Sequence, residues 1–67
     1  MKFSEILREL REEKGLSQKQ LSNIVGISQS SVAKWELSKV EPSAGALITL
    51  ANFFGITVGQ LLGVESN

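Results

Sequence analysis

The sequence predicts an all-α fold of five helices. Apolar residues recur at helical spacing in two longer segments, near residues 3–14 and 43–55, and no segment has the character of a strand. Serine or threonine stands where four of the helices would begin, and glycine follows several of their ends. Because the chain has 67 residues and no cysteine, we expect one domain, residues 1–67, stabilised by well-packed helices or by self-association.

The first two helices have clear ends in the sequence. The first is predicted over residues 3–14 and stops at Gly15, a residue that readily takes the left-handed conformation found after helices. The second begins at Ser17, whose hydroxyl can cap the first turn while Gln20 reaches back to complete a capping box, and it ends near Val25. The apolar face of the first helix consists of Phe3, Ile6, Leu7 and Leu10.

The third helix, predicted over residues 28–37 with Ser28 as its cap, has two different faces. Val32 and Trp35 lie three apart and should point into the core. The outward face has short or amide-bearing side chains and one cation: Gln29, Ser30, Ala33 and Lys34. Since the connector 25–27 is tight, residues 17–37 form two helices at a fixed angle, and the outward face suits the major groove of DNA.

The last two helices complete the predicted fold. Pro42 and Ser43 begin the fourth helix, which Gly55 closes. Thr57 and Gln60 form a second possible capping box, over a short fifth helix that ends near Leu62.

The charge distribution is uneven although the formal net charge is zero and the pI is about 6.2. Glu5, Glu9 and Glu12 fall on one side of the first helix and should face solvent. Four lysines lie at or near the helix ends and connectors around residues 17–37, where they could meet phosphates: Lys14, Lys19, Lys34 and Lys39.

With these features in order, the chain resembles the lambda-repressor and Cro-like helix-turn-helix family, also called the Xre family. The resemblance extends from about residue 6 to residue 62. It rests on Arg11, Gly15-Leu16-Ser17-Gln18, Leu21 followed by a small residue, Gly26, Trp35-Glu36, Pro42-Ser43, Leu50-Ala51 and Phe54-Gly55-Ile56. It implies a five-helix lambda-repressor-like domain that binds double-stranded DNA with its third helix in the major groove, in a transcriptional regulator and more specifically a repressor.

Base contacts are expected from the outward face of the third helix. The Gln29 amide can pair at two points with adenine, and Lys34 can meet either guanine or a phosphate. Ser30 and Ala33 are small enough to allow close approach or to meet a thymine methyl group.

Phosphate contacts are expected from residues around the motif. Gln18 lies in the first turn of the second helix, where backbone amides and the positive end of the dipole favour anions, although a merely solvated side chain is the alternative. In the family this glutamine also braces the recognition glutamine, here Gln29, and the arginine of the first helix pairs with the glutamate ending the third, here Arg11 and Glu36. Whether Arg11 also touches DNA stays open. The complete expected set is Arg11, Ser17, Gln18, Lys19, Ser28 and Lys39.

Two departures from the family are visible. Ser22 stands where members usually have alanine, so its hydroxyl should bond to a carbonyl of its own helix. Ser38 stands where many members have glycine, which puts the path of the following loop, and the contacts of Lys39, in question.

A dimer surface is predicted from apolar residues of the C-terminal part: Ile48, Phe53, Leu62 and Val64. Family members often pair there, which places two recognition helices one DNA turn apart on a pseudo-palindromic operator. Ordinary partial exposure is the alternative.

Other functions are weighed against DNA binding. An enzyme is not expected, because the chain lacks histidine, cysteine, tyrosine and a glycine-rich phosphate loop. No cofactor or metal ion is expected. A protein-interaction module on the same fold, such as an antitoxin-type domain, is the main competitor. We expect a cytoplasmic protein, since neither a signal peptide nor a membrane span is evident, and the chain could be the DNA-binding part of a longer regulator with a further C-terminal domain.

Overall fold

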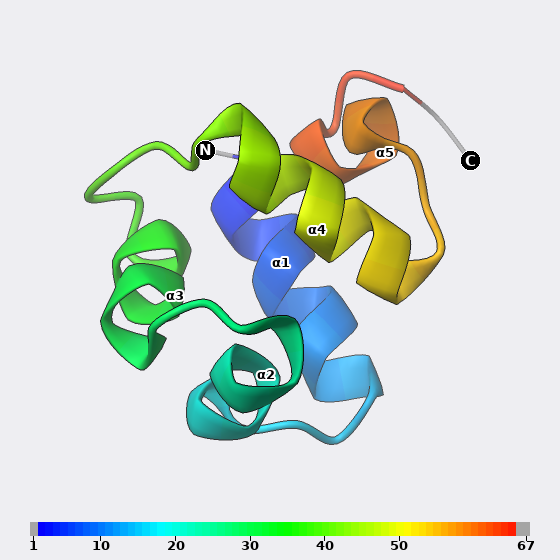
Figure 1. Cartoon of the computed structure of the whole chain (residues 1–67). Coiled ribbons are helices and arrows are strands. Elements are labelled where there is room, and N and C mark those ends of the chain that lie inside the picture. Colours follow the sequence, from blue (N-terminus) through cyan, green and yellow to red (C-terminus); the bar gives the residue numbers. More distant parts are fainter. Residues whose placement is uncertain (1, 66–67) are drawn as a thin grey trace.

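The computed structural model describes residues 2–65, and within that range it contains five α-helices and no strand (Figure 1). The helices are α1 (Lys2–Glu13), α2 (Gln18–Val25), α3 (Gln29–Glu36), α4 (Ala44–Phe54) and α5 (Val58–Leu62). The predicted all-α class and the order of five helices are therefore confirmed. The predicted end of the first helix was one residue too late: the Lys14 amide still donates to the Leu10 carbonyl at 3.3 Å, but the chain then turns through Gly15 with a φ of 69°.

Hydroxyl side chains cap four of the helices, as predicted. Ser17 and Thr57 both form complete capping boxes. Each hydroxyl accepts a hydrogen bond from the backbone amide of the residue three positions on, and the side-chain oxygen of that residue, Gln20 or Gln60, accepts one from the backbone amide of the cap. Ser28 and Ser43 accept from the amides of Ser31 and Ala46. These bonds satisfy amides that have no partner within the helix, so local sequence fixes where each helix begins.

One apolar core joins all five helices. Within the described residues it consists of Phe3, Leu7, Leu21, Val32, Trp35, Leu50, Ala51 and Leu61. Phe3 of α1 meets Trp35 of α3 edge to face, with ring centroids 6.4 Å apart. In Figure 1, α1 runs through the middle, with α2 and α3 towards one side and α4 and α5 towards the other. None of the described helices combines the length and the apolar character that crossing a membrane requires.

Two residues around the end of α2 have structural roles. Ser22 is buried, and its hydroxyl donates to the Lys19 carbonyl in its own helix at 2.8 Å, as predicted. Gly26 ends α2 with a φ of 70°, a conformation that is costly for residues with a Cβ atom. The end of α2 is thus set by local sequence.

Ser38 adopts the left-handed conformation that glycine takes most readily. Its φ is 58°, and it is the only residue other than glycine in the described chain with a positive φ. The Ser38 amide donates to the Trp35 carbonyl at 3.1 Å and the Lys39 amide to the Lys34 carbonyl at 2.9 Å, which together form a Schellman motif. The serine therefore accepts the left-handed conformation, and the helix end keeps a regular hydrogen-bonded closure.

Candidate nucleic-acid interface

The outward face of α3 is open to solvent. Gln29, Ser30 and Lys34 are exposed, and Ala33 is half-buried between them and the core. On the opposite face, Val32 and Trp35 are buried. The polar flank that the sequence predicted is therefore bare and supported from behind by the core.

The start of α2 lies beside the C-terminal end of α3, because Gln18 in its first turn contacts Glu36 and the two helices pack together. The Ser17 hydroxyl is engaged with the Gln20 amide at 3.0 Å, whereas the amides of Gln18 and Lys19 belong to the first turn, whose N–H groups have no partner within a helix. The positive end of the helix dipole adds to these donors. This turn can donate hydrogen bonds to a phosphate oxygen without any change in the fold.

The cap of α3 is occupied in a similar way. The Ser28 hydroxyl accepts from the Ser31 amide at 3.1 Å and donates to the Ser31 hydroxyl at 2.9 Å. Any contact between Ser28 and DNA would therefore use its remaining acceptor capacity or backbone groups nearby.

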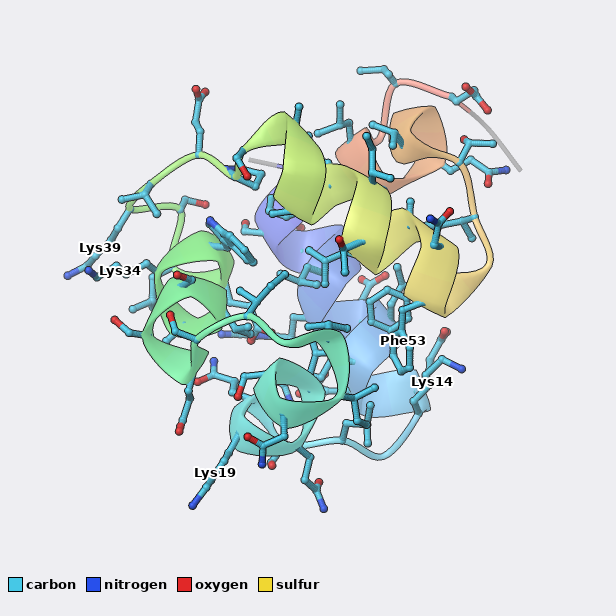
Figure 2. All side chains as sticks on the ribbon, viewed as in Figure 1. Lys14, Lys19, Lys34, Lys39 and Phe53 are labelled. Atoms are coloured by element: carbon cyan, nitrogen blue, oxygen red, sulfur yellow. The ribbon has the colours of Figure 1, made fainter. Side chains whose placement is uncertain are left out.

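Of the four lysines predicted around residues 17–37, three lie on the side of the molecule formed by α2, α3 and the loop after α3. Figure 2 shows Lys34 of α3 and Lys39 of the following loop projecting together, with Lys19 of α2 further along the same side. All three side chains are exposed. Lys14 is elsewhere: its ammonium group lies 5.3 Å from the centre of the Phe53 ring. Lys14 follows the end of α1, as predicted, but its side chain lies apart from the other three, beside an aromatic ring of α4.

A buried carboxylate joins the first three helices. The Glu36 side chain has no exposed surface, and Arg11 donates to it through Nε at 2.7 Å and Nη2 at 3.0 Å. The third nitrogen of Arg11, Nη1, donates to the Leu16 carbonyl at 2.7 Å. Arg8 approaches the same carboxylate at 3.7 Å with a half-exposed side chain. The end of α3 is thereby tied to α1.

The environment of Glu36 keeps it ionised. Burial raises the pKa of the Glu36 carboxyl, but hydrogen bonds from Arg11 and Gln18 and the positive charges of Arg11 and Arg8 outweigh burial and bring the pKa below its usual value. The hydrogen bond to Glu36 is also the main reason that the pKa of Arg11 is raised. The pair is charged in the neutral pH range.

Gln18 braces a different residue from the one expected. Its Nε2 donates to Glu36 Oε1 at 3.1 Å, at the opposite end of α3 from Gln29. A buried carboxylate is a stronger acceptor than a solvated amide, which explains the preference. The side-chain amide of Gln18 therefore fixes α2 against the end of α3, and Gln29 is left free to turn towards solvent.

The predicted dimer residues divide into two groups. Ile48 and Val64 are 54% and 80% exposed. Phe53 and Leu62 are half-buried and pack against the core, with Phe53 also edge to face on Phe54 at 5.0 Å.

Sequence reasoning did not single out three exposed apolar residues, Ile24, Leu37 and Val40, nor the approach of Arg8 to Glu36. Leu37 and Val40 flank the Schellman motif after α3, and their exposure depends on a turn that the sequence alone did not specify.

Comparison with known proteins agrees with this architecture. A helix-turn-helix family model matches residues 7–61, from the middle of α1 to α5. The chain belongs to the lambda-repressor-like, or Xre, helix-turn-helix family.

Relatives within this family are named as transcriptional regulators. The chain is 44% identical over 66 residues to the transcriptional regulator DdrOP3 of Deinococcus deserti, covering 97% of this chain and 51% of the relative. It is 37% identical over 65 residues to the transcriptional activator BcrR of Enterococcus faecalis, covering 97% and 32%. It is 28% identical over 60 residues to the cryptic phage CTXphi repressor RstR of Vibrio cholerae, covering 90% and 54%. The chain thus spans a third to about half of the length of these relatives.

Proposed function

We propose that this chain is a single domain that binds double-stranded DNA at specific sequences and directs a transcriptional regulator to its operator. The observation that carries the proposal is the bare polar face of α3, which presents Gln29 and Lys34 outwards while Glu36 anchors the same helix to α1 and α2. A helix held this rigidly can enter the major groove without losing much conformational entropy.

In this proposal the two kinds of contact come from different elements. Gln29, Ser30, Ala33 and Lys34 meet base edges, and the Gln29 amide pairs with adenine. The backbone amides at the start of α2, together with Ser17, Gln18, Lys19, Ser28 and Lys39, meet phosphates. Arg11 already uses three N–H groups within the protein, so at most the remaining two of its five can reach a phosphate.

We further propose that two copies bind a pseudo-palindromic operator as a homodimer through the C-terminal part. The exposed side chains of Ile48 and Val64 supply apolar surface there. The molecule measures 28 × 23 × 20 Å, so two copies in contact can place their α3 helices one DNA turn, about 34 Å, apart. Repression would follow from occupying a promoter in the cytoplasm, and no cofactor is needed for it.

The test is duplex binding at varied salt. Sites selected from a random duplex pool should be bound, and affinity measured by fluorescence anisotropy should fall steeply as salt rises. If Lys19 and Lys39 each neutralise about one phosphate, affinity per protomer should fall roughly 12-fold between 50 and 200 mM salt. A pool from which no sequence is enriched, or an affinity that salt leaves unchanged, would instead favour a protein-interaction module on this fold.

A further inference from the structure

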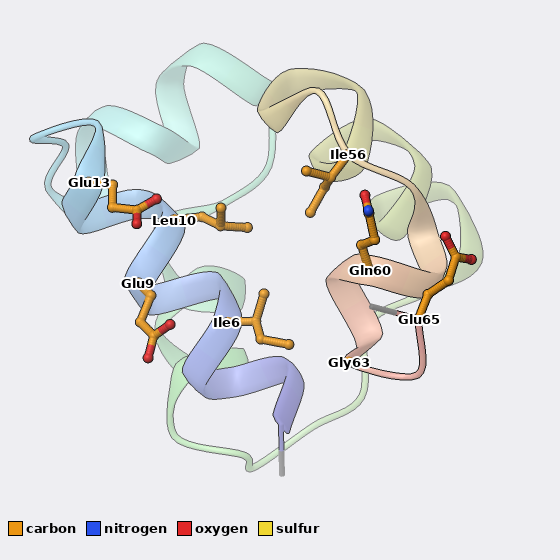
Figure 3. A pocket seen from close by; sticks show the side chains of 8 residues that line it. All are labelled: Ile6, Glu9, Leu10, Glu13, Ile56, Gln60, Gly63 and Glu65. Atoms are coloured by element: carbon orange, nitrogen blue, oxygen red, sulfur yellow. The ribbon is translucent and has the colours of Figure 1, made fainter. Parts of the chain in front are cut away.

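A groove between α1 and α5 is separate from the proposed DNA-binding face. None of its lining residues belongs to α2 or α3. Its volume is about 460 Å³. Figure 3 shows the side chains of Ile6 and Leu10 on α1 pointing across it towards Ile56, which precedes α5.

The three apolar residues of this groove are only half covered. Ile6, Leu10 and Ile56 pack against the core on one side and are half-buried. Their remaining surface faces the groove and forms its apolar floor. Covering that surface with a partner would remove apolar area from water, which is the main source of binding free energy at such sites.

The rim of the groove is acidic. Glu9 and Glu13 line it from α1, Glu65 lines it from the end of the described chain, and no lysine or arginine is among its lining residues. The ion pairs of the described residues all involve Glu36, so these three carboxylates have none there. Among the cations of α1 and its end whose side chains the structure describes, Arg8 and Arg11 face Glu36, and Lys14 faces the Phe53 ring. A partner with positive charge would be attracted to this rim.

One of the rim carboxylates is held in place. Glu65 accepts a hydrogen bond from the Thr57 hydroxyl at 2.8 Å, across the start of α5. The Glu65 side chain lies against Gly59, where an added Cβ atom would collide with the Glu65 carboxylate. Glycine at this position therefore lets an acidic side chain fold back over α5 beside the groove.

We propose that this groove docks a basic amphipathic segment of a partner protein. Apolar side chains of the segment would cover Ile6, Leu10 and Ile56, and its lysines or arginines would pair with Glu9, Glu13 and Glu65. A second copy of this chain fits less well, because the residues that border the groove are acidic in both copies. Since α3 lies outside the groove, the partner can bind while α3 is engaged with DNA.

The test uses a synthetic helical peptide with leucine on one face and lysine on the other. Titrated into ¹⁵N-labelled protein, it should shift amide signals of residues 6–13 and 56–65 and leave those of α3 in place. The double variant Glu9→Gln/Glu13→Gln should weaken the peptide about tenfold. The control Glu41→Gln removes the same kind of charge from the exposed loop after α3 and should leave peptide affinity unchanged.

Two comparison peptides separate docking from general attraction to negative charge. A peptide with alanine in place of leucine keeps the charge and should bind much more weakly, and one with glutamate in place of lysine should not bind. Equal binding of the alanine and leucine peptides, or equal weakening by Glu41→Gln and by the double variant, would overturn the proposal. Thermal unfolding should show that the double variant is folded, and its unchanged affinity for duplex would keep this result independent of the DNA-binding proposal.

Discussion

At the scale of single residues, different side chains of the proposed interface make base contacts and phosphate contacts. The Gln29 amide can form a pair of hydrogen bonds with one base, whereas Lys39 offers a charge that any phosphate satisfies. Both side chains are exposed, so replacing either one should leave the core intact.

Gln29→Ala is therefore expected to weaken binding to the selected duplex by about 1–3 kcal/mol and to relax preference at one base pair. Lys39→Ala should weaken all duplexes alike and reduce the slope of log K against log salt by about 1. Anisotropy titrations against the selected duplex and single-base variants measure both effects. A uniform loss across sequences for Gln29→Ala would remove it from base readout.

Replacing Ser38 by glycine should stabilise the fold. Its left-handed conformation at the end of α3 is one that glycine adopts without steric cost, so Ser38→Gly should raise the free energy of unfolding by about 0.5–1 kcal/mol. The matched control is Ser30→Gly within α3, where glycine should lower it by a similar amount of about 0.5–1 kcal/mol. Urea unfolding measures both, and a loss of stability in Ser38→Gly would show that the Ser38 conformation carries no strain.

At the scale of elements, Glu36 couples three helices through one carboxylate. Arg11 of α1 and Gln18 of α2 both donate to it from outside α3. Replacing the carboxylate by an amide removes the counter-charge of the largely covered Arg11 guanidinium and one of its two acceptor oxygens on Glu36. Glu36→Gln should therefore cost about 2–4 kcal/mol of stability at neutral pH.

The same cluster gives stability a defined pH dependence. Because the pKa of Glu36 is lower in the folded state, the unfolded chain takes up the proton first as pH falls. The contribution of Glu36 is complete above its usual pKa and is lost as pH drops below about 5 towards the folded pKa. Thermal unfolding between pH 7 and pH 3 should show a shallower decline for Glu36→Gln than for the natural chain or for Glu41→Gln; parallel curves would contradict this role.

The elements also show which parts of the structure the sequence can predict. The caps at Ser17, Ser28, Ser43 and Thr57 were predictable because each depends on residues three positions away. The bond from Gln18 to Glu36 was not, since it joins residues eighteen apart in sequence that meet only after α2 packs on α3. The Lys14 contact with Phe53 was missed for the same reason. Local signals thus specify helix ends, whereas tertiary packing decides which polar groups remain free for a ligand.

At the scale of the whole molecule, zero net charge is compatible with DNA binding because the charges are segregated. Lys19, Lys34 and Lys39 lie on the side of the motif, and Glu9, Glu13 and Glu65 border the groove between α1 and α5. Phosphates at short range respond to the local lysines, since screening limits the reach of the distant carboxylates to about 8–10 Å at ordinary salt. The overall charge therefore says little about this interface.

The proposed dimer can be tested with variants of two isoleucines that are equally exposed. Ile48 on α4 and Ile24 on α2 are 54% and 55% exposed, but only Ile48 belongs to the proposed dimer surface. Ile48→Ser should weaken binding to a full palindrome by about 100-fold while leaving half-site affinity unchanged, because it removes the coupling between two copies. Ile24→Ser should alter neither affinity. Equal behaviour of the two variants would place the dimer contact elsewhere.

The placement of α3 in the major groove is tested most directly by titrating ¹⁵N-labelled protein with the selected duplex and following the backbone amide signals. If α3 enters the major groove with the start of α2 on the backbone, the largest shifts will fall on residues 17–19 and 28–34, with smaller changes in Lys39. Shifts confined to α4 and α5, with the outward face of α3 unchanged, would show that α3 does not bind the DNA.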